Sequence, residues 1–232
     1  MSDSNIALIT GAAGNLGREV VKVFNDHHFK VHGSIEPGKN PKTDKQAMLV
    51  WHEVDLKKEE SALTFVKDVV NVEKRIDACL MLVGGFAMGD IHKTRISDIR
   101  EMIRLNFETA FHIARPVFQQ MITQEGGGKL VFIGSKPALE VQAGKGLMAY
   151  ALSKSLLFQL AEMLNAEGEA QQVTASVVVP SIIDTPLNRN AMPNADFEKW
   201  VSPHALAEVM HFICSKAGKD IRKGVYKVYG GS

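Results

Sequence analysis

The stretch NIALITGAAGNLGREVVKVF, residues 5–24, decides the fold of this chain. A short apolar run is followed by glycines at positions 11, 14 and 17, and an amphipathic helical pattern begins directly after them. Glycines at such a junction let the backbone turn tightly and approach a pyrophosphate, which binds to the N–H groups at the helix start. The alternative is a glycine-rich turn that only allows close packing. The position between a first strand and a helix favours a dinucleotide-binding loop, formed by Gly11, Asn15, Leu16 and Gly17.

The alternation of strand and helix continues along the rest of the chain. Further apolar runs predict strands at 30–35, 48–54, 77–83, 129–134, 174–179 and 224–229. Periodic segments predict helices near 15–27, 58–73, 97–123, 148–168 and 203–217. Most of the apolar runs are continuous, as in strands buried on both faces of a parallel sheet. We therefore predict a single Rossmann-type α/β domain over residues 1–232, with a doubly wound, mostly parallel sheet of seven strands and helices on both faces. The crossover at 36–47 contains two prolines and no apolar stripe, so a loop is expected there.

Composition and charge exclude several classes of protein. The 232 residues are 45% hydrophobic and 23% charged, and the formal net charge of +1 predicts no general attraction to nucleic acid or to an anionic membrane. The first residues show neither a signal peptide nor a membrane span, so we expect a cytoplasmic protein. Cys79 and Cys214 stand alone and are expected to be reduced core thiols. His204 and His211 share a predicted helix, but no third ligand is expected at matching spacing, so we predict no metal site.

The stretch MAYALSKSLLFQ, residues 148–159, places Tyr150 and Lys154 four positions apart in a helical pattern. The two side chains then share one helix face, about one turn apart. A packed tyrosine beside a solvated lysine is the simpler alternative. Ser135, at the end of the strand KLVFIG, and Asn106, inside the predicted helix 97–123, favour chemistry instead, because ligands bind at strand ends and a buried amide must be hydrogen-bonded. Asn106 is expected either to kink its helix or to join a polar relay.

Together these motifs resemble the short-chain dehydrogenase/reductase family over nearly the whole chain. They are T-G-x-x-G-x-x-G at 10–17, Asp55-Leu56 after the third strand, Asn106, Ser135 and Tyr150-x-x-x-Lys154. The resemblance implies an NAD(P)(H)-dependent oxidoreductase in which Tyr150 gives or takes a proton while a hydride moves between the nicotinamide and a carbonyl or alcohol. Lys154 and the positively charged oxidised nicotinamide would lower the pKa of the phenol, Ser135 would hold the substrate oxygen, and Asn106 would support a water relay.

Several stretches differ from the usual pattern of the family and are similar to its dihydropteridine reductase branch, which recycles quinonoid dihydropterin with NADH. They are the glycine spacing, MLVGGF at 81–86, the short 36–47 crossover and TPLNRNAMPNADFEKW at 185–200. The pair Pro180-Ser181 also departs from the Pro-Gly that is usual in the family. That branch lacks the serine and the asparagine that this chain has at 135 and 106, which favours a carbonyl or alcohol substrate. Quinonoid dihydropteridine reductase remains one alternative. A second is an NAD(H)-sensing protein without turnover, which would need the glycine loop but no proton donor.

The cofactor is expected at the glycine loop and at the strand ends. Glu36, at the end of the second strand, would bond the ribose hydroxyls and repel a 2′-phosphate, so NAD(H) is preferred, while Lys39 keeps NADP(H) possible. Asp55 would cap the helix beginning near Lys58, bond the adenine amino group, or do both. The full predicted cofactor set is Gly11, Asn15, Leu16, Gly17, Glu36, Asp55, Leu56, Val83, Gly84, Gly85, Tyr150, Lys154, Pro180, Ile183 and Thr185.

Two further expectations concern mobility and assembly. Residues 185–200, rich in proline, asparagine and methionine, would form a mobile lid over a small-molecule substrate or, alternatively, an ordered surface loop. The family resemblance implies a homodimer or homotetramer that pairs through the helices at 97–123 and 148–168. The exposed sides of those helices would then be partly apolar.

Overall fold

Seven strands form the sheet in the computed structural model, which describes residues 4–39 and 48–231. They are β1 (Ile6–Thr10), β2 (Lys30–Ile35), β3 (Leu49–Glu53), β4 (Ala78–Met81), β5 (Gly128–Ile133), β6 (Val173–Pro180) and β7 (Val225–Val228). Every pairing is parallel, in the order β3-β2-β1-β4-β5-β6-β7. The seven predicted strands and their parallel arrangement are confirmed.

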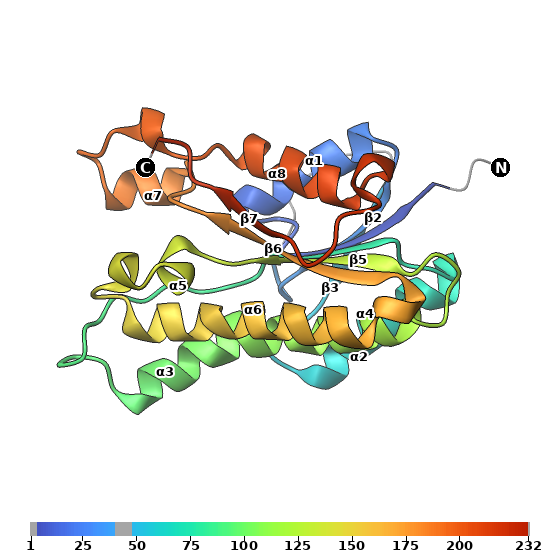
Figure 1. Cartoon of the computed structure of the whole chain (residues 1–232), viewed down its shortest axis with the longest axis horizontal. Coiled ribbons are helices and arrows are strands. Elements are labelled where there is room, and N and C mark those ends of the chain that lie inside the picture. The colour runs from blue at the N-terminus through green and yellow to red at the C-terminus, as the bar shows by residue number, and fades with distance from the viewer. Residues whose placement is uncertain (1–3, 40–47, 232) are drawn as a thin grey trace.

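The helices form two layers, one on each face of the sheet (Figure 1). One layer holds α1 (Asn15–Asp26) and α8 (Pro203–Cys214), which pack side by side. The other holds α2 (Glu59–Glu73), α4 (Thr109–Met121) and α6 (Met148–Glu167), with α3 (Ile96–Ile103) against α6. Each face has its own apolar core, the first around Phe24 and Leu206 and the second around Phe65, Ile113 and Leu157. Burial on both faces explains why the strands are continuously apolar.

The predicted helix at 97–123 is interrupted. α3 ends at Ile103, a π-helical turn spans Arg104–Glu108, and α4 begins at Thr109. Such turns insert one extra residue into a helix and are frequent at functional sites. Asn106 lies at the centre of this turn and is fully buried. Asn106 therefore lies at a distortion of its helix and also makes the polar contacts described below, while its part in a polar relay stays a prediction.

Two short helices are additions to the predicted elements. α5 (Lys136–Leu139) follows β5, and α7 (Pro186–Ala191) follows β6. Both lie at the end of the molecule where the strands finish (Figure 1). α7 and a 3₁₀ turn at Phe197–Lys199 occupy most of the 185–200 segment, so this segment has secondary structure, and its mobility stays a prediction.

The crossover from β2 to β3 is described only in part. Residues 36–39 form a turn with Gly38 at φ +77°, whereas 40–47, where most of the expected loop falls, lie outside the described residues.

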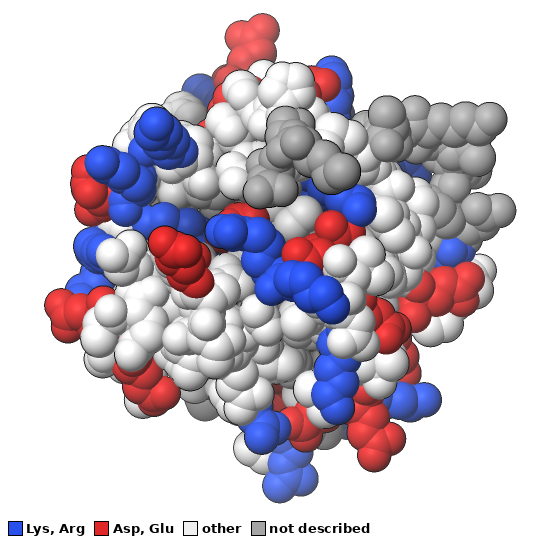
Figure 2. All heavy atoms as spheres, turned by 90° about the vertical axis from the view of Figure 1, so that its right-hand side faces the viewer, with Lys and Arg blue, Asp and Glu red and all other residues white. Residues whose placement is uncertain are grey.

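The end of the molecule where the strands begin carries positive and negative side chains next to one another (Figure 2). Ion pairs there include Lys30–Glu73 at 2.6 Å. No helix within the described ranges has the length and hydropathy required to cross a bilayer.

Candidate active site

The predicted catalytic residues converge where β4 and β5 end, and α6 brings two of them there. Lys154 on α6 is buried, with 5% of its surface exposed, and its Nζ donates a hydrogen bond of 2.8 Å to the carbonyl of Ile133. Burial without a partner carboxylate disfavours the charged form and lowers the pKa of Lys154 to about 8. The prediction of a solvated lysine, kept as the simpler alternative, is therefore wrong.

Tyr150 lies one turn before Lys154 and is half-buried. Burial raises the pKa of Tyr150, and the nearby Ser135 hydroxyl opposes part of that shift. In the protein without a dinucleotide, burial dominates and the Lys154 ammonium is directed to the Ile133 carbonyl, so the lowering of this pKa by Lys154 together with the oxidised nicotinamide stays a prediction. The phenol is therefore protonated at neutral pH and is poised to donate a proton.

Ser135 immediately follows β5, in the extended conformation that precedes α5. Its side chain is 4% exposed, and its Oγ interacts with the Tyr150 phenol without reaching hydrogen-bond geometry to any residue in the described ranges. A buried hydroxyl without a full partner costs free energy. An oxygen atom of a bound substrate would satisfy it.

Asn106 connects three parts of the site. Its Oδ1 accepts from the Gly85 N–H at 2.9 Å, and its Nδ2 donates to Ser153 Oγ at 2.9 Å. Ser153 in turn donates to the Tyr150 carbonyl at 2.8 Å. The amide thus holds the loop after β4 against the first turns of α6. Ser153 was not predicted; the signal that could have identified it is a small polar residue three positions after Tyr150 in an apolar helix.

Glycine at position 84 is required by this packing. A Cβ built there would lie 2.5 Å from Asn106 Oδ1 and 3.1 Å from Lys154 Nζ. The backbone after β4 therefore passes directly over the two polar groups. The Gly84-Gly85 pair lies at the predicted place, beside the catalytic residues.

Phe86 is a second residue that the sequence did not predict for the site. Its ring meets the Tyr150 ring edge-on with centroids 5.0 Å apart, yet 62% of its surface is exposed. The Gly89 N–H donates to the Gly146 carbonyl at 2.7 Å, and the Met148 N–H donates to the Gly89 carbonyl at 3.0 Å. These bonds hold the loop that carries Phe86 against the start of α6.

The glycine loop fits a dinucleotide pyrophosphate. Gly11 has φ +64°, which favours glycine, and a Cβ at Gly17 would come within 2.1 Å of the Gly11 carbonyl oxygen. Gly17 is buried and allows α1 to pack against the loop, so the packing role of these glycines is present, while dinucleotide binding stays a prediction. Gly14 and Asn15 are exposed, no side chain caps α1, and its first turn contains no acidic residue. The N–H groups of that turn are suited to an anion.

Glu36 lies just after β2, as predicted, but it has two cationic neighbours. Lys39 Nζ is 2.7 Å and Lys57 Nζ is 3.6 Å from its carboxylate. The contact with Lys39, followed by the charge of Lys57, holds the pKa of Glu36 below its usual value. The carboxylate is therefore ionised and able to accept ribose hydroxyls, while the lysines provide positive charge next to it.

Asp55 does not cap α2, so that alternative is wrong. α2 begins at Glu59, and its N-terminal residues have no side-chain cap. Asp55 Oδ1 instead accepts from the Lys57 N–H at 3.2 Å within the preceding turn. The role of Asp55 toward adenine stays a prediction. Leu56 is buried, and its carbonyl is 2.9 Å from His112 Nδ1.

The remaining predicted cofactor residues lie at the ends of β4 and β6. Val83 follows β4, Pro180 ends β6, and Ile183 accepts a hydrogen bond of 2.8 Å from the Asn188 side chain. Thr185 is 7% exposed, and its Oγ1 accepts from the Asn188 N–H at 3.2 Å, so it is the N-cap of α7. Thr185 thereby positions the short helix above the strand ends.

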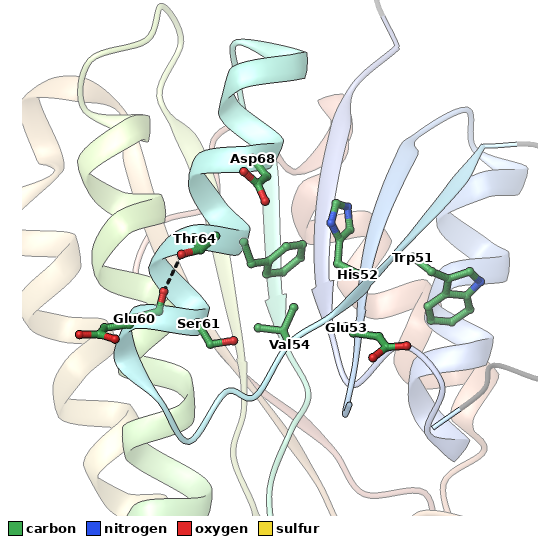
Figure 3. A pocket seen from close by; sticks show the side chains of 9 residues that line it. Trp51, His52, Glu53, Val54, Glu60, Ser61, Thr64 and Asp68 are labelled. Carbon is green, nitrogen blue, oxygen red and sulfur yellow. Dashed lines mark hydrogen bonds between the residues drawn. The ribbon is translucent and has the colours of Figure 1, made fainter. Parts of the chain in front are cut away.

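A separate cavity of about 510 Å³ lies between β3 and α2 (Figure 3). Its walls come from β3 on one side and from α2 on the other, and none of the predicted site residues lines it. His52, in its wall, is 2.9 Å from buried His32, which is 3.0 Å from Glu73. Burial lowers the pKa of both histidines. This cavity lies at the edge strand β3, and Ser135, Tyr150 and Lys154, which lie on or next to β5 and α6, take no part in its lining.

Comparisons of this chain with known proteins agree on one protein family. The model of the short chain dehydrogenase family matches residues 5–196. The chain is 22% identical to an acetoacetyl-CoA reductase of Acinetobacter sp. (strain RA3849), with 100% of this chain and 98% of that protein covered. It is 27% identical to a dihydropteridine reductase of Dictyostelium discoideum, with 87% and 84% covered. The structure of ElxO with NADP bound has a TM-score of 0.90 over 98% of both chains at 17% identity, which shows a shared fold.

Proposed function

This chain belongs to the short-chain dehydrogenase family, and we propose that it reduces a ketone or aldehyde with NADH. As a member of that family it is an oxidoreductase that uses NAD(P)(H). We choose this substrate class because of one observation. The buried Ser135 hydroxyl lies beside the Tyr150 phenol without a full hydrogen-bond partner. A substrate carbonyl oxygen placed between the two hydroxyls would complete the hydrogen bonding of both.

The chemistry of the residues follows from their protonation states. NADH, when bound at the glycine loop, would supply the hydride for the carbonyl carbon, whose C=O π bond breaks as the oxygen takes up the electron pair. The Tyr150 O–H bond breaks as its proton goes to the substrate oxygen, and a phenolate remains. Ser135 donates a hydrogen bond to the same oxygen while negative charge develops there. The Lys154 ammonium, one turn away, stabilises the phenolate until a proton from solvent restores the phenol.

Replacing Ser135 with alanine tests the substrate class. A preorganised donor to a developing oxyanion contributes about 10²–10³-fold to kcat, so Ser135→Ala is expected to lower ketone or aldehyde reduction by about that factor. The measurement is NADH oxidation with a panel of carbonyl substrates and with quinonoid dihydropterin. Ser155→Ala is the matched control and should retain activity, because the Ser155 hydroxyl on α6 donates to the Leu152 carbonyl within its own helix.

Dihydropteridine reduction is the alternative function, and the similarity to the dihydropteridine reductase of Dictyostelium discoideum supports it. A quinonoid dihydropterin is already electron-poor and needs little hydrogen bonding at oxygen. If Ser135→Ala leaves every activity intact and pterin is the only good substrate, the carbonyl proposal is wrong. An NAD(H) sensor is the other alternative, and it gains support if NADH binds tightly but no substrate of the panel is reduced.

The preference for NAD(H) rests on the Glu36 carboxylate at the end of β2. Hydrogen bonds to charged groups contribute about 1.5–3 kcal/mol, so Glu36→Gln is expected to weaken NADH binding by about tenfold. NADPH binding should become tighter in the same variant, because Lys39 and Lys57 then face the 2′-phosphate without the carboxylate. Fluorescence titration with both dinucleotides measures the ratio, with Glu53→Gln as the control. Tighter binding of NADPH than of NADH by the unmodified chain would reverse the assignment.

We also propose that the chain forms a homodimer or homotetramer through α4 and α6. Phe111 on α4 is 38% exposed, and Leu152 and Met163 on α6 are 49% and 60% exposed. The outer sides of both helices are thus partly apolar, and a second copy would bury these side chains. Light scattering should give a mass of at least twice the 25.4 kDa chain. A monomeric mass would contradict the proposal.

A further inference from the structure

The contact between α1 and α8 holds three potential metal ligands. His27 follows α1, and Glu208 and His211 lie about one turn apart on α8. One ligand atom of each lies within 4.8 Å of the other two. The prediction that His211 has no further ligand at matching spacing is therefore wrong, because Glu208 precedes it by three positions and the fold adds His27. We propose that His27, Glu208 and His211 bind a zinc ion.

Ring packing brings the two imidazoles together. His27 and His211 stack with centroids 3.7 Å apart and planes 11° apart. His211 also meets the Phe24 ring edge-on at 5.8 Å and the Phe29 ring at 6.1 Å, so aromatic rings surround it.

The set of donor atoms determines the class of metal. Two imidazole nitrogens and one carboxylate oxygen suit Zn²⁺, whereas Mg²⁺ and Ca²⁺ prefer oxygen ligands. Zinc binds such atoms at about 2.0–2.2 Å, so the three side chains must converge on the ion. His27 and Glu208 are exposed and can rotate without unpacking the core. The parallel rings cannot both direct in-plane lone pairs at one ion, so His27 is the ring that must leave the stack.

Neighbouring residues supply a fourth ligand or support for the first three. His204 Nε2 lies 3.7 Å from Glu208 Oε1, and His204 Nδ1 lies 2.9 Å from Glu19 on α1. A chain of alternating carboxylates and imidazoles thus runs along the contact between α1 and α8. Carboxylate–imidazole pairs of this kind orient metal-binding histidines.

The ion would join two helices and take no part in the reaction. α1 has 12 residues, so its C-terminal end lies roughly 18 Å from the glycine loop at its start. Zinc bound to groups from both helices binds the folded chain and not the unfolded one, and it therefore stabilises the fold. The proposal goes beyond the proposed function, and its test does not depend on any activity.

Zinc titration of the full chain, without an affinity tag and after removal of metals with a chelator, tests the site. Calorimetry should show one Zn²⁺ per chain, with a higher melting temperature, and Mg²⁺ should produce neither effect. Cobalt(II) bound in place of zinc should give the visible absorption of a tetrahedral site. Glu208→Gln and His27→Ala are each expected to weaken zinc binding by at least about tenfold.

The matched control is His92→Ala, because His92 is an exposed histidine outside the cluster. This variant should bind zinc as the unmodified chain does. Circular dichroism and the melting temperature without metal show whether each variant is folded. Absence of saturable zinc binding would overturn the proposal, and so would equal binding by Glu208→Gln, His27→Ala and His92→Ala. Loss of binding in Cys214→Ser alone would also overturn it, because the ion would then be bound by the thiol.

Discussion

Replacing Tyr150 with phenylalanine is expected to lower kcat/KM for carbonyl reduction by about 10²–10⁴-fold, the usual contribution of a positioned proton donor. The substitution removes one oxygen atom and leaves the ring in contact with Phe86. Burial raises the pKa of the Tyr150 phenol, so at neutral pH the group that is lost carries the proton to be donated. Steady-state NADH oxidation measures the effect, and NADH binding should stay within a few-fold of the unmodified value.

Tyr226→Phe is the matched control, because Tyr226 is a half-buried tyrosine on β7 whose pKa is also raised by burial. It is expected to retain activity. Equal activities of Tyr150→Phe and the unmodified chain would show that the proton comes from another group, and the assignment of the site would be wrong. Loss of activity in Tyr226→Phe as large as in Tyr150→Phe would indicate a general effect on the fold.

Replacing Lys154 with methionine is expected to lower activity and to raise stability. In the proposed reaction the ammonium, one turn from Tyr150 on α6, stabilises the phenolate, and loss of such electrostatic stabilisation costs about 10²–10³-fold in kcat. Its burial lowers the pKa from 10.5 to about 8, which corresponds to a destabilisation of roughly 3 kcal/mol at neutral pH. The lost hydrogen bond to the Ile133 carbonyl offsets about 1 kcal/mol or more of the gain. Methionine should therefore stabilise the fold by roughly 1–2 kcal/mol.

The dependence on pH separates this effect from simple repacking. The pKa of Lys154 is lower in the folded chain than in the unfolded chain, so the destabilisation is fully present below pH 8. It disappears as the pH rises from about 8 toward 10.5, where the unfolded chain also releases the proton. Urea denaturation at pH 7 and pH 9.5 should thus show the advantage of Lys154→Met shrinking at the higher pH. An advantage that is equal at both pH values would contradict this explanation.

Lys129→Met is the matched control for activity. Burial also lowers the pKa of Lys129, but its ammonium donates to the carbonyls of Gly218, Lys219 and Ile221 at the amino end of β5. Loss of these bonds should change stability and leave kcat unaffected. A fall in kcat for Lys129→Met comparable to that for Lys154→Met would indicate that the activity responds to stability rather than to the charge near Tyr150.

The sequence by itself determined the sheet and the succession of strands and helices along the chain, and it predicted which residues form the candidate site. Continuous apolar runs identify buried parallel strands, and the glycine spacing identifies the turn into α1, because both signals are local and are set by backbone geometry. The four-residue spacing of Tyr150 and Lys154 likewise places them on one helix face whatever surrounds them. The crossover at 36–47 shows the limit of such signals. Its lack of an apolar stripe predicts that a helix is not favoured there, but it does not predict which conformation the chain adopts instead.

Tertiary structure decided how these residues interact, because burial and contacts between distant segments have no local signal. The π-helical turn at Asn106 depends on Gly85 and Ser153, which lie 21 and 47 positions away. The direction of the Lys154 ammonium is set by the Ile133 carbonyl on β5, and burial raises the pKa of Tyr150 in the protein without a dinucleotide, which the spacing of the two residues does not predict. His27 reaches His211 only because α1 and α8 pack on the same face of the sheet. Residue identity and spacing thus specify which groups are available, while packing decides their protonation states and their partners.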